Sequence, residues 1–300
     1  MKHSNLSSKT LMQTASYASV FIAIVLIAVK IASYFLTNSL SILASLMDSG
    51  MDLGASIVSL IAIRQALQPA DNDHRFGHGK AEALGSFIQA VFIILSGLFL
   101  FSEAFDHYFN PKPFRHFDVV LIAMVFSIFA TFGLILLQRW VIKRTNSLSI
   151  RADNAHYTGD IAMNIGVIVS MAFSYHFQSH WIDATFAVVV AFYLIFTAYR
   201  ITKKVLEILM DKELSDKVRQ LVKETALQHK DVLKIRDLRT RDGGMHHSFI
   251  QFCVELNPEI SLKKAHSICD ELEKELKSKL PKTQIFIHAE PCSGKGNQPS

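Results

Sequence analysis

The sequence predicts an α-helical membrane protein with six transmembrane helices, built as an inverted three-helix repeat and followed by a cytoplasmic α+β domain. Three observations predict this fold. Half of the 300 residues are hydrophobic, and many of them lie in runs of membrane-spanning length. One pentapeptide occurs twice, before two of these runs. From about residue 206 the chain changes to charged and apolar residues in alternation, which is typical of a water-soluble domain.

Each apolar run meets the length of about 20 residues that a helix needs to cross the hydrocarbon core. We expect spans at residues 12–36, 41–67, 82–106, 118–141, 152–174 and 182–205. The predicted domains are a cytoplasmic N-terminal segment at 1–11, the transmembrane domain at 12–205, the cytoplasmic domain at 206–292 and a flexible tail at 293–300.

Lysine and arginine residues predict the orientation of the spans. Most of those before residue 206 fall at span ends that six crossings place on one side, whereas the opposite loops hold Lys112 and Arg115. By the positive-inside rule, both termini are cytoplasmic. This bias accounts for the net charge of +5 without nucleic acid as a partner. We expect no cleavable signal peptide, because the first span is too long and lacks a cleavage pattern.

The three cysteines, Cys253, Cys269 and Cys292, all lie in the predicted cytoplasmic domain. Their odd number and reducing surroundings argue against disulfide bonds.

The pentapeptide NSLSI occurs at residues 38–42 and 146–150. Placed in register, the two copies align DSGMD of the second span with HYTGD of the fifth span. Three spans separate the copies, so the two helices cross the membrane in opposite directions. Such inverted repeats are typical of secondary transporters, whose substrate sites lie near the bilayer midplane.

The repeat brings four ionisable side chains to the same depth. Asp48 and His156 each lie ten residues past the start of their pentapeptide, or about 15 Å along a helix. Because the helices start from opposite faces of a layer about 30 Å thick, these residues meet near its middle. The predicted site therefore comprises Asp48, Asp52, His156 and Asp160.

Three carboxylates at one point beside an imidazole repel one another when the site is empty and they are ionised. A divalent cation removes this repulsion, and four oxygen and nitrogen ligands suit tetrahedral Zn²⁺. Calcium and magnesium prefer more oxygen ligands, while Fe²⁺, Cd²⁺, Co²⁺ and Mn²⁺ stay open. Without metal the cluster can hold protons, which an entering metal must expel. If the cluster opens alternately to the two sides of the membrane, competition between metal and protons for it drives an antiport mechanism.

Helix packing, a membrane metalloenzyme and a metal sensor are the alternatives to transport. Polar residues in spans also serve helix packing, although ionisable ones are functional by default. A membrane metalloenzyme would keep an open water position and a general base, and the chain has no H-E-x-x-H motif. A membrane-anchored metal sensor would not require two ionisable pairs at the bilayer centre. We therefore expect a transporter and not an enzyme.

DSGMD, HYTGD, six spans and a helix–strand–strand–helix–strand cytoplasmic domain resemble the cation diffusion facilitators. The stretches LQPADNDHRFGHGKAEAL, RADNAHYTGD and DLRTRDGG extend this resemblance over about residues 10–292. It implies a homodimer in the bacterial inner membrane that exports Zn²⁺, or alternatively Fe²⁺ or Cd²⁺, from the cytoplasm in exchange for protons. It also implies that the four intramembrane residues form the transport site, in the pattern of the zinc-type branch.

The loop after the second span offers a second group of ligands. Asp71, His74 and His78 follow a D-x-x-H-x-x-x-H spacing beside Gly77 and Gly79. The spacing alone fits a metal site about as well as a solvated polar turn. The family resemblance favours the metal site, and it leaves open whether that site delivers ions, senses them or braces the fold.

The cytoplasmic domain is predicted to be metallochaperone-like. Its expected elements are a helix at 214–229, strands at 232–240 and 245–256, a helix at 261–279 and a strand at 283–290. In the second strand the residues Ile250, Phe252 and Val254 alternate as a buried face, so Cys253 points the other way.

The resemblance implies a metal-binding region in this domain, at the dimer interface. Arg236 and Cys253 replace two of the usual histidines, and Glu290 replaces the usual aspartate. Arginine carries a permanent positive charge, so zero, one or two metal ions stay open. One zinc site could use Cys253, His266, His288 and Glu290. The alternative is a structural dimerisation domain with surface histidines.

The resemblance further suggests an ion pair between Lys80, at the start of the third span, and Asp211, at the start of the cytoplasmic domain. Such a pair would act as a hinge of the dimer.

Overall fold

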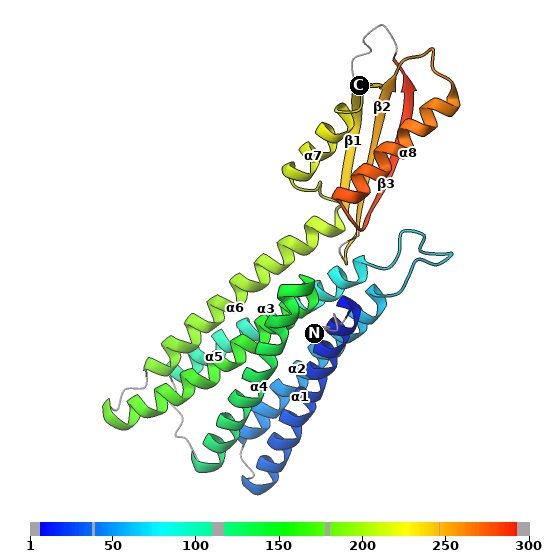
Figure 1. Cartoon of the computed structure of the whole chain (residues 1–300). Helices are drawn as coiled ribbons and strands as arrows, with labels where there is room; N and C mark the ends of the chain where they lie inside the picture. The colour runs from blue at the N-terminus through cyan, green and yellow to red at the C-terminus, as the bar shows by residue number, and fades with distance from the viewer. Residues whose placement is uncertain (1–6, 38–39, 110–116, 178–180, 246, 293–300) are drawn as a thin grey trace, which may run out of the picture. The chain divides into compact units, whose positions relative to one another are not determined.

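The structure is a computed structural model that describes residues 7–37, 40–109, 117–177, 181–245 and 247–292. The chain divides into two compact units, Met1–Leu206 and Glu207–Ser300 (Figure 1). The first unit is made of long helices: α1 (Ser8–Thr37), α2 (Leu40–Ala66), α3 (Lys80–Phe109), α4 (Phe117–Thr145), α5 (Leu148–Phe177) and α6 (Trp181–Leu209).

Four segments among the described residues are long and apolar enough to cross a membrane: Ser8–Phe35, Lys80–Asp106, Met124–Thr145 and Thr185–Leu209. They belong to α1, α3, α4 and α6. The other two helices, α2 and α5, carry the acidic and histidine residues of the predicted site, which make them less apolar. The helical membrane fold is confirmed, and four of the six predicted spans are confirmed individually.

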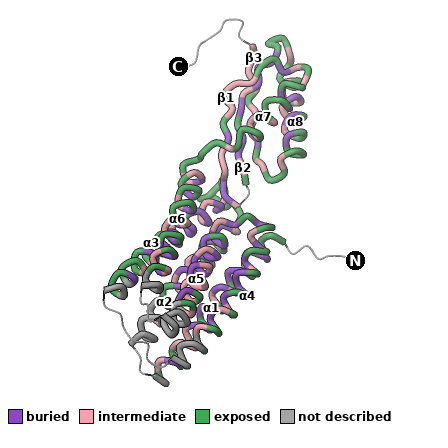
Figure 2. The backbone as a smooth tube through the Cα atoms, turned by 90° about the vertical axis from the view of Figure 1, so that its left-hand side faces the viewer, coloured by how far each residue is buried: buried purple, intermediate pink, exposed green. Residues whose placement is uncertain are grey.

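Small residues fill the contacts between these helices. α1 packs against α2 and α4, α2 packs against α3, and α5 lies against α2, α3 and α4. Figure 2 shows the buried residues on the inward faces of these helices. Alanine and serine dominate there, as at Ala15, Ala62, Ala90, Ser56 and Ser86. Close backbone approach through small residues is the usual way in which helices associate in lipid.

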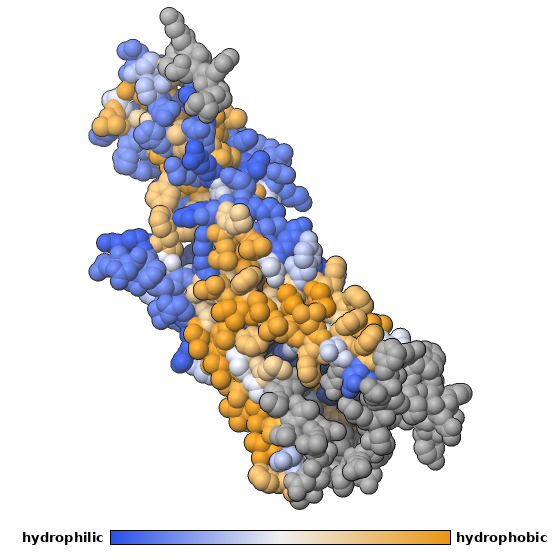
Figure 3. Space-filling view, turned by 180° about the vertical axis from the view of Figure 1, so that it is seen from behind, coloured by the Kyte–Doolittle hydropathy of each residue, from blue (hydrophilic) through white to orange (hydrophobic). Residues whose placement is uncertain are grey.

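Large apolar side chains point outward from the same unit. Phe21, Ile61 and Phe129 are more than half exposed. Figure 3 shows such side chains gathered over the helices of the first unit. Exposed phenylalanine and isoleucine with buried serine is the reverse of a water-soluble bundle. This distribution fits helices whose outer surface contacts lipid.

The second unit is an α+β domain. Its elements are α7 (Asp216–Leu227), β1 (Val232–Asp242), β2 (Ser248–Leu256), α8 (Leu262–Lys279) and β3 (Thr283–Pro291), in the predicted order. The sheet order is β1-β2-β3, with β1 and β2 antiparallel and β2 and β3 parallel. α8 provides the crossover that a parallel pair requires.

The core of this domain lies between the sheet and its two helices. Ile250, Phe252 and Val254 are fully buried, which confirms the alternation predicted for this strand. Ile268 and Leu272 of α8, four residues apart on one helix face, pack into the same core. Leu256 of β2 is also buried and continues the alternation, but Phe249 and Glu255 are buried as well, so the alternation is incomplete.

The second strand begins later than its predicted start at residue 245. Gly244 and Met245 have φ angles of +78° and +49°, which belong to a turn and not to a strand. The amide of Gly243 donates to the carbonyl of His247 across this turn. Pairing with β1 therefore starts at Ser248.

Candidate metal centres

Three of the four predicted intramembrane ligands meet where α2 contacts α5. The Nε2 atom of His156 lies 2.7 Å from Oδ1 of Asp52, and both side chains are buried. Asp160 lies one turn beyond His156 in α5. One ligand atom from each of these three residues falls within 4.8 Å of the others. The spacing matches a cluster that could share one metal ion.

Asp48, the fourth predicted ligand, lies in α2, but its side chain is outside the described residues. It precedes Asp52 by four residues, so the helix places both on one face.

His156 also has unused binding capacity. Its Nδ1 atom is buried and has no hydrogen-bond partner among the described residues. Buried polar atoms are rarely left without partners, because their desolvation is costly. A neutral imidazole nitrogen without another partner can bind a divalent cation such as Zn²⁺.

Lys30 is a residue that the sequence reasoning missed. It lies inside the apolar helix α1, and its ammonium group donates to Ser49 of α2, the neighbour of Asp48 in the chain. The signal was present in the sequence, since a lysine within a span is costly and marks a functional position by default.

Asp153 is a second missed residue. It lies in α5, is almost fully buried and accepts hydrogen bonds from side chains of three other helices. The stretch RADNAHYTGD contains it, yet no spacing rule distinguishes it from a residue at the cytoplasmic end of the span.

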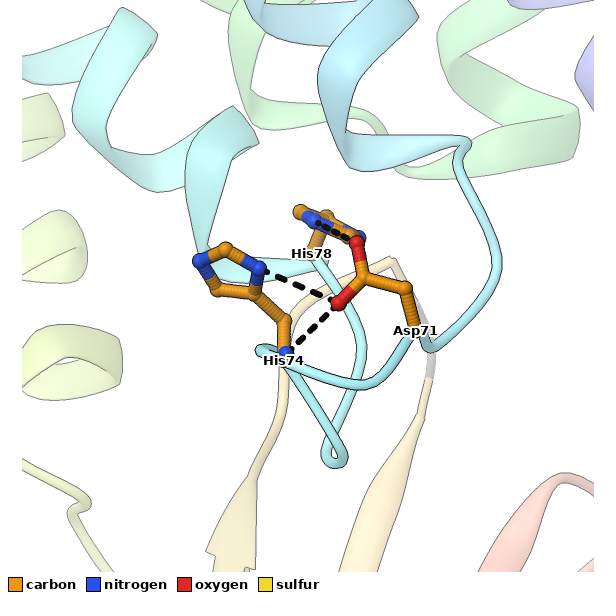
Figure 4. A group of neighbouring side chains, drawn as sticks. All are labelled: Asp71, His74 and His78. Atoms are coloured by element: carbon orange, nitrogen blue, oxygen red, sulfur yellow. Dashed lines mark hydrogen bonds and ion pairs between the residues drawn. The ribbon is translucent and has the colours of Figure 1, made fainter.

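The loop between α2 and α3 brings Asp71, His74 and His78 together, with one ligand atom from each within 4.8 Å (Figure 4). Asp71 lies between the two rings: its Oδ1 is 3.3 Å from Nδ1 of His74, and its Oδ2 is 3.4 Å from Nε2 of His78. Gly77 has a φ of +81°, the left-handed conformation that glycine adopts without strain. This turn returns the chain so that both imidazoles face one carboxylate.

Hydrogen bonds fix the positions of Asp71 and His78 in this loop. The backbone amide of His74 donates to Asp71 Oδ1 at 2.6 Å, and this bond is the main cause that lowers the pKa of Asp71 below its ordinary value. The Nδ1 atom of the buried His78 lies 3.2 Å from the carbonyl of Pro69. If Nδ1 carries the proton for that bond, Nε2 keeps its lone pair for a metal, as second-sphere bonds do in metal sites.

The cytoplasmic domain does not gather its four predicted ligands within one chain. Cys253 pairs with Arg236 across β1 and β2 and with His288 across β2 and β3. The nearest carboxylate to His288 Nε2 is that of Glu290, at 3.8 Å. His266 is largely exposed on α8 and lies 3.4 Å from Asp270 instead. A zinc site in this domain stays a prediction.

Arg236 carries a positive charge on β1, an edge strand of this sheet. Its guanidinium donates to Glu255 Oε1 at 3.3 Å, which accounts for the buried position of that glutamate. Burial and the negative charge of Glu290 raise the pKa of the Cys253 thiol. The thiol is therefore less ready to ionise than an exposed cysteine.

Asp211 contacts Arg241 within the second unit, with its Oδ2 3.3 Å from the guanidinium Nη1. Lys80 begins α3 in the first unit. The ion pair proposed between Lys80 and Asp211 stays a prediction.

Comparison with known proteins covers almost the whole chain. Residues 16–210 match the family described as cation efflux transmembrane domain, and residues 214–292 match the family described as cation efflux protein, cytoplasmic domain. The cation-efflux pump FieF of Serratia proteamaculans is 37% identical over 284 residues, 94% of each chain. The FieF protein of Escherichia coli K12 is 36% identical over 289 residues, 96% of each chain.

Among solved structures, the cytoplasmic region is similar to a nickel form of the MamM CTD. The two are 21% identical, and the match covers 26% of this chain and all of that one, with a TM-score of 0.25.

Proposed function

This chain belongs to the cation efflux family, and on that premise we propose that it exports divalent metal ions, Zn²⁺ first among them, in exchange for protons. The observation that carries the proposal is the cluster of the buried Asp52 and His156 with the partly buried Asp160, in which Nδ1 of His156 has no hydrogen-bond partner among the described residues. Its relatives are named as pumps for cations.

The substrate preference follows from the chemistry of the ligands. Asp48 would complete a set of three carboxylates and one imidazole, which suits tetrahedral Zn²⁺. Fe²⁺ and Cd²⁺ are the alternative substrates, because geometry and availability, more than intrinsic affinity, select among these ions. Calcium and magnesium are disfavoured, since they prefer six or more oxygen ligands or retained waters.

Coupling to protons follows from the contact between His156 and Asp52. In the metal-free state, a proton shared by these two groups satisfies the 2.7 Å hydrogen bond and reduces the repulsion among the carboxylates. A metal ion needs the neutral imidazole and the ionised carboxylate, so its entry displaces that proton. Alternating exposure of the cluster to the two sides of the membrane then exchanges metal for protons.

The remaining parts of the proposal concern orientation and assembly. Basic residues at one set of helix ends place both termini in the cytoplasm of a bacterial cell, so transport runs outward. The protein acts as a homodimer through its cytoplasmic domain. The loop site of Asp71, His74 and His78 binds the same metal on the cytoplasmic side.

The test is transport by the purified protein in lipid vesicles that contain a zinc-sensitive dye, with an imposed pH gradient. We expect zinc uptake that rises with the gradient, and loss of uptake in Asp52→Ala. Asp216→Ala removes an exposed aspartate of α7 and serves as the matched control. The proposal fails if wild type moves no metal, or if Asp52→Ala moves it equally well. Uptake that ignores the gradient would remove the proton coupling alone.

A further inference from the structure

Asp153 is a buried carboxylate that the proposed transport mechanism does not use. Only 2% of it is exposed, and it lies three residues before His156 in α5. Three helices donate to it: Ser56 Oγ of α2 lies 3.3 Å from Oδ1, Gln89 Nε2 of α3 lies 3.4 Å from Oδ1, and Gln138 Nε2 of α4 lies 2.7 Å from Oδ2. One side chain therefore ties α5 to α2, α3 and α4.

A second layer of contacts extends this network to α1. Gln138 Nε2 also donates to Ser19 Oγ at 2.9 Å, and its Oε1 accepts from Asn154 Nδ2 at 3.0 Å. The hydroxyl of Tyr157 lies 2.9 Å from Ser56 Oγ, and it is 3.4 Å from the carbonyl of Ser19. All of these residues are buried. The network therefore connects five helices, α1, α2, α3, α4 and α5, at one level of the bundle.

That level lies next to the cluster of Asp52, His156 and Asp160. Ser56 follows Asp52 by four residues in α2, and Asp153 precedes His156 by three residues in α5. Because α2 and α5 run in opposite directions, the contacts of Ser56 with Asp153 and Tyr157 form the next polar level between these helices after that of Asp52 with His156. A further level follows where Ser59 Oγ and Ser149 Oγ lie 2.9 Å apart.

These contacts matter because apolar burial does not set the register of helices in lipid. Lipid tails are as apolar as leucine, so packing and hydrogen bonds decide how two helices slide and rotate against each other. A buried carboxylate with several donors has a strong preference for one arrangement, since each lost bond leaves a desolvated charge.

We propose that Asp153 is a positioning residue of the transport site, which holds α2 and α5 in the register that brings Asp52 to His156. The inference rests on the proposed function for the identity of the ion, and it adds a residue outside the ligand set. Partners that orient metal ligands are worth about 10- to 100-fold in metal affinity. We expect a loss of that size when Asp153 loses its charge.

The experiment compares full-length variants in detergent by zinc titration with a competing dye. Asp153→Asn keeps the shape but loses one acceptor oxygen. Ser56→Ala removes the donor from α2 and tests the same contact with a milder change. Ser86→Ala is the matched control, because it deletes an equally buried hydroxyl that donates within its own helix, to the carbonyl of Glu82. We expect weaker zinc binding in the first two variants and wild-type binding in the control.

A second readout measures register without metal. In a background with serine at the three native cysteines, Ser59→Cys and Ser149→Cys place two thiols on facing positions of α2 and α5. We expect rapid oxidative cross-linking in the presence of a chelator, and slower cross-linking when Asp153→Asn is added. A pure effect on folding would lower the thermal midpoint and leave both zinc affinity and cross-linking of the folded fraction unchanged.

Wild-type zinc affinity in Asp153→Asn would overturn the inference. It would also fall if affinity dropped while Ser56→Ala and the cross-linking rate stayed at wild-type values, because Asp153 would then act directly on the metal. A protein that binds zinc with this dependence but transports none in vesicles would refute the proposed function and leave the positioning role intact.

Discussion

His156 Nε2 lies 2.7 Å from Asp52 Oδ1, and this contact joins the two helices that carry the repeated polar pairs. The distance is that of a charge-assisted hydrogen bond between buried groups. It brings together an imidazole of α5 and a carboxylate of α2, and one ligand atom of Asp160 lies within 4.8 Å of one from each of them.

Replacing this histidine should change which metals the protein moves. His156→Asp adds a carboxylate and removes the nitrogen ligand, so zinc affinity should fall at least tenfold, given that outer partners alone cost about 10- to 100-fold. Transport should broaden toward harder ions such as Mn²⁺. Vesicle uptake with a panel of metals measures this change. An unchanged preference for zinc would count against His156 as a ligand.

The loop site should depend more on His78 than on His74. The His78 side chain is 6% exposed and its Nδ1 contacts Pro69, whereas the His74 side chain is 60% exposed. A preorganised ligand loses less entropy on binding. The comparison uses a background in which Asp52→Ala and His156→Ala remove zinc binding between α2 and α5. In that background, calorimetry should show a larger loss of zinc affinity for His78→Ala than for His74→Ala.

Arg75→Ala serves as the control for this comparison, because it changes an exposed residue of the same loop outside the cluster. Equal losses for the two histidines would refute the argument from preorganisation. Because the pKa of Asp71 is lowered, its carboxylate is charged at every pH above the ordinary carboxyl pKa. It loses that charge only as the pH falls through the lowered pKa. Asp71→Asn should therefore weaken binding at neutral pH.

Cys253 should react slowly with alkylating reagents. Its thiol pKa is raised above the ordinary 9.0, chiefly by burial and then by the negative charges of Glu290 and Asp237. The thiol therefore stays protonated at neutral pH. Glu290→Gln removes one negative charge, which should lower the pKa of the Cys253 thiol and so speed alkylation. The rate with iodoacetamide in a Cys269→Ser, Cys292→Ser background measures this.

Glu259→Gln is the control for the charge effect, since it neutralises an exposed glutamate after β2. Equal rates in Glu290→Gln and its parent would show that Glu290 does not act on the thiol. Protection of Cys253 by Zn²⁺ would indicate that the cytoplasmic domain binds metal through this residue.

Gly85→Ala should destabilise the contact between α2 and α3. A Cβ at Gly85 would overlap the Cβ of Ala62, and neither atom belongs to a flexible side chain. The clash, about 1–3 kcal/mol for an overpacked site, outweighs the gain of about 1 kcal/mol in helix propensity. Gly133→Ala meets no atom within 4 Å and should be neutral or stabilising. Thermal unfolding in detergent compares the two, and equal midpoints would contradict the packing argument.

The sequence could predict features that depend on local periodicity. The spacing of DSGMD and HYTGD puts each polar pair on one helix face, and the alternation of Ile250, Phe252 and Val254 predicts a buried strand face. Both rest on geometry that any helix or strand imposes on its own residues. The proximity of Asp71, His74 and His78 was also predictable, because they lie within one short loop.

The sequence could not predict which side chains contact each other between helices, because those contacts depend on how the helices pack. The pairing of His156 with Asp52, the donors around Asp153 and the approach of Lys30 to Ser49 all require the rotation and register of one helix against another. No periodicity within a single helix specifies these. The residues predicted as ligands in the cytoplasmic domain are not all brought together within one chain. Cys253 and His288 lie on adjacent strands, while His266 is exposed on α8.

From the sequence alone follow the membrane-length helices, the inverted repeat and the residue types able to bind a divalent cation. Only the tertiary structure decided which of those residues touch and which buried groups hold them in place. The physical reason is that secondary structure orders residues a few positions apart, whereas a site shared by several helices exists only once their faces have packed together.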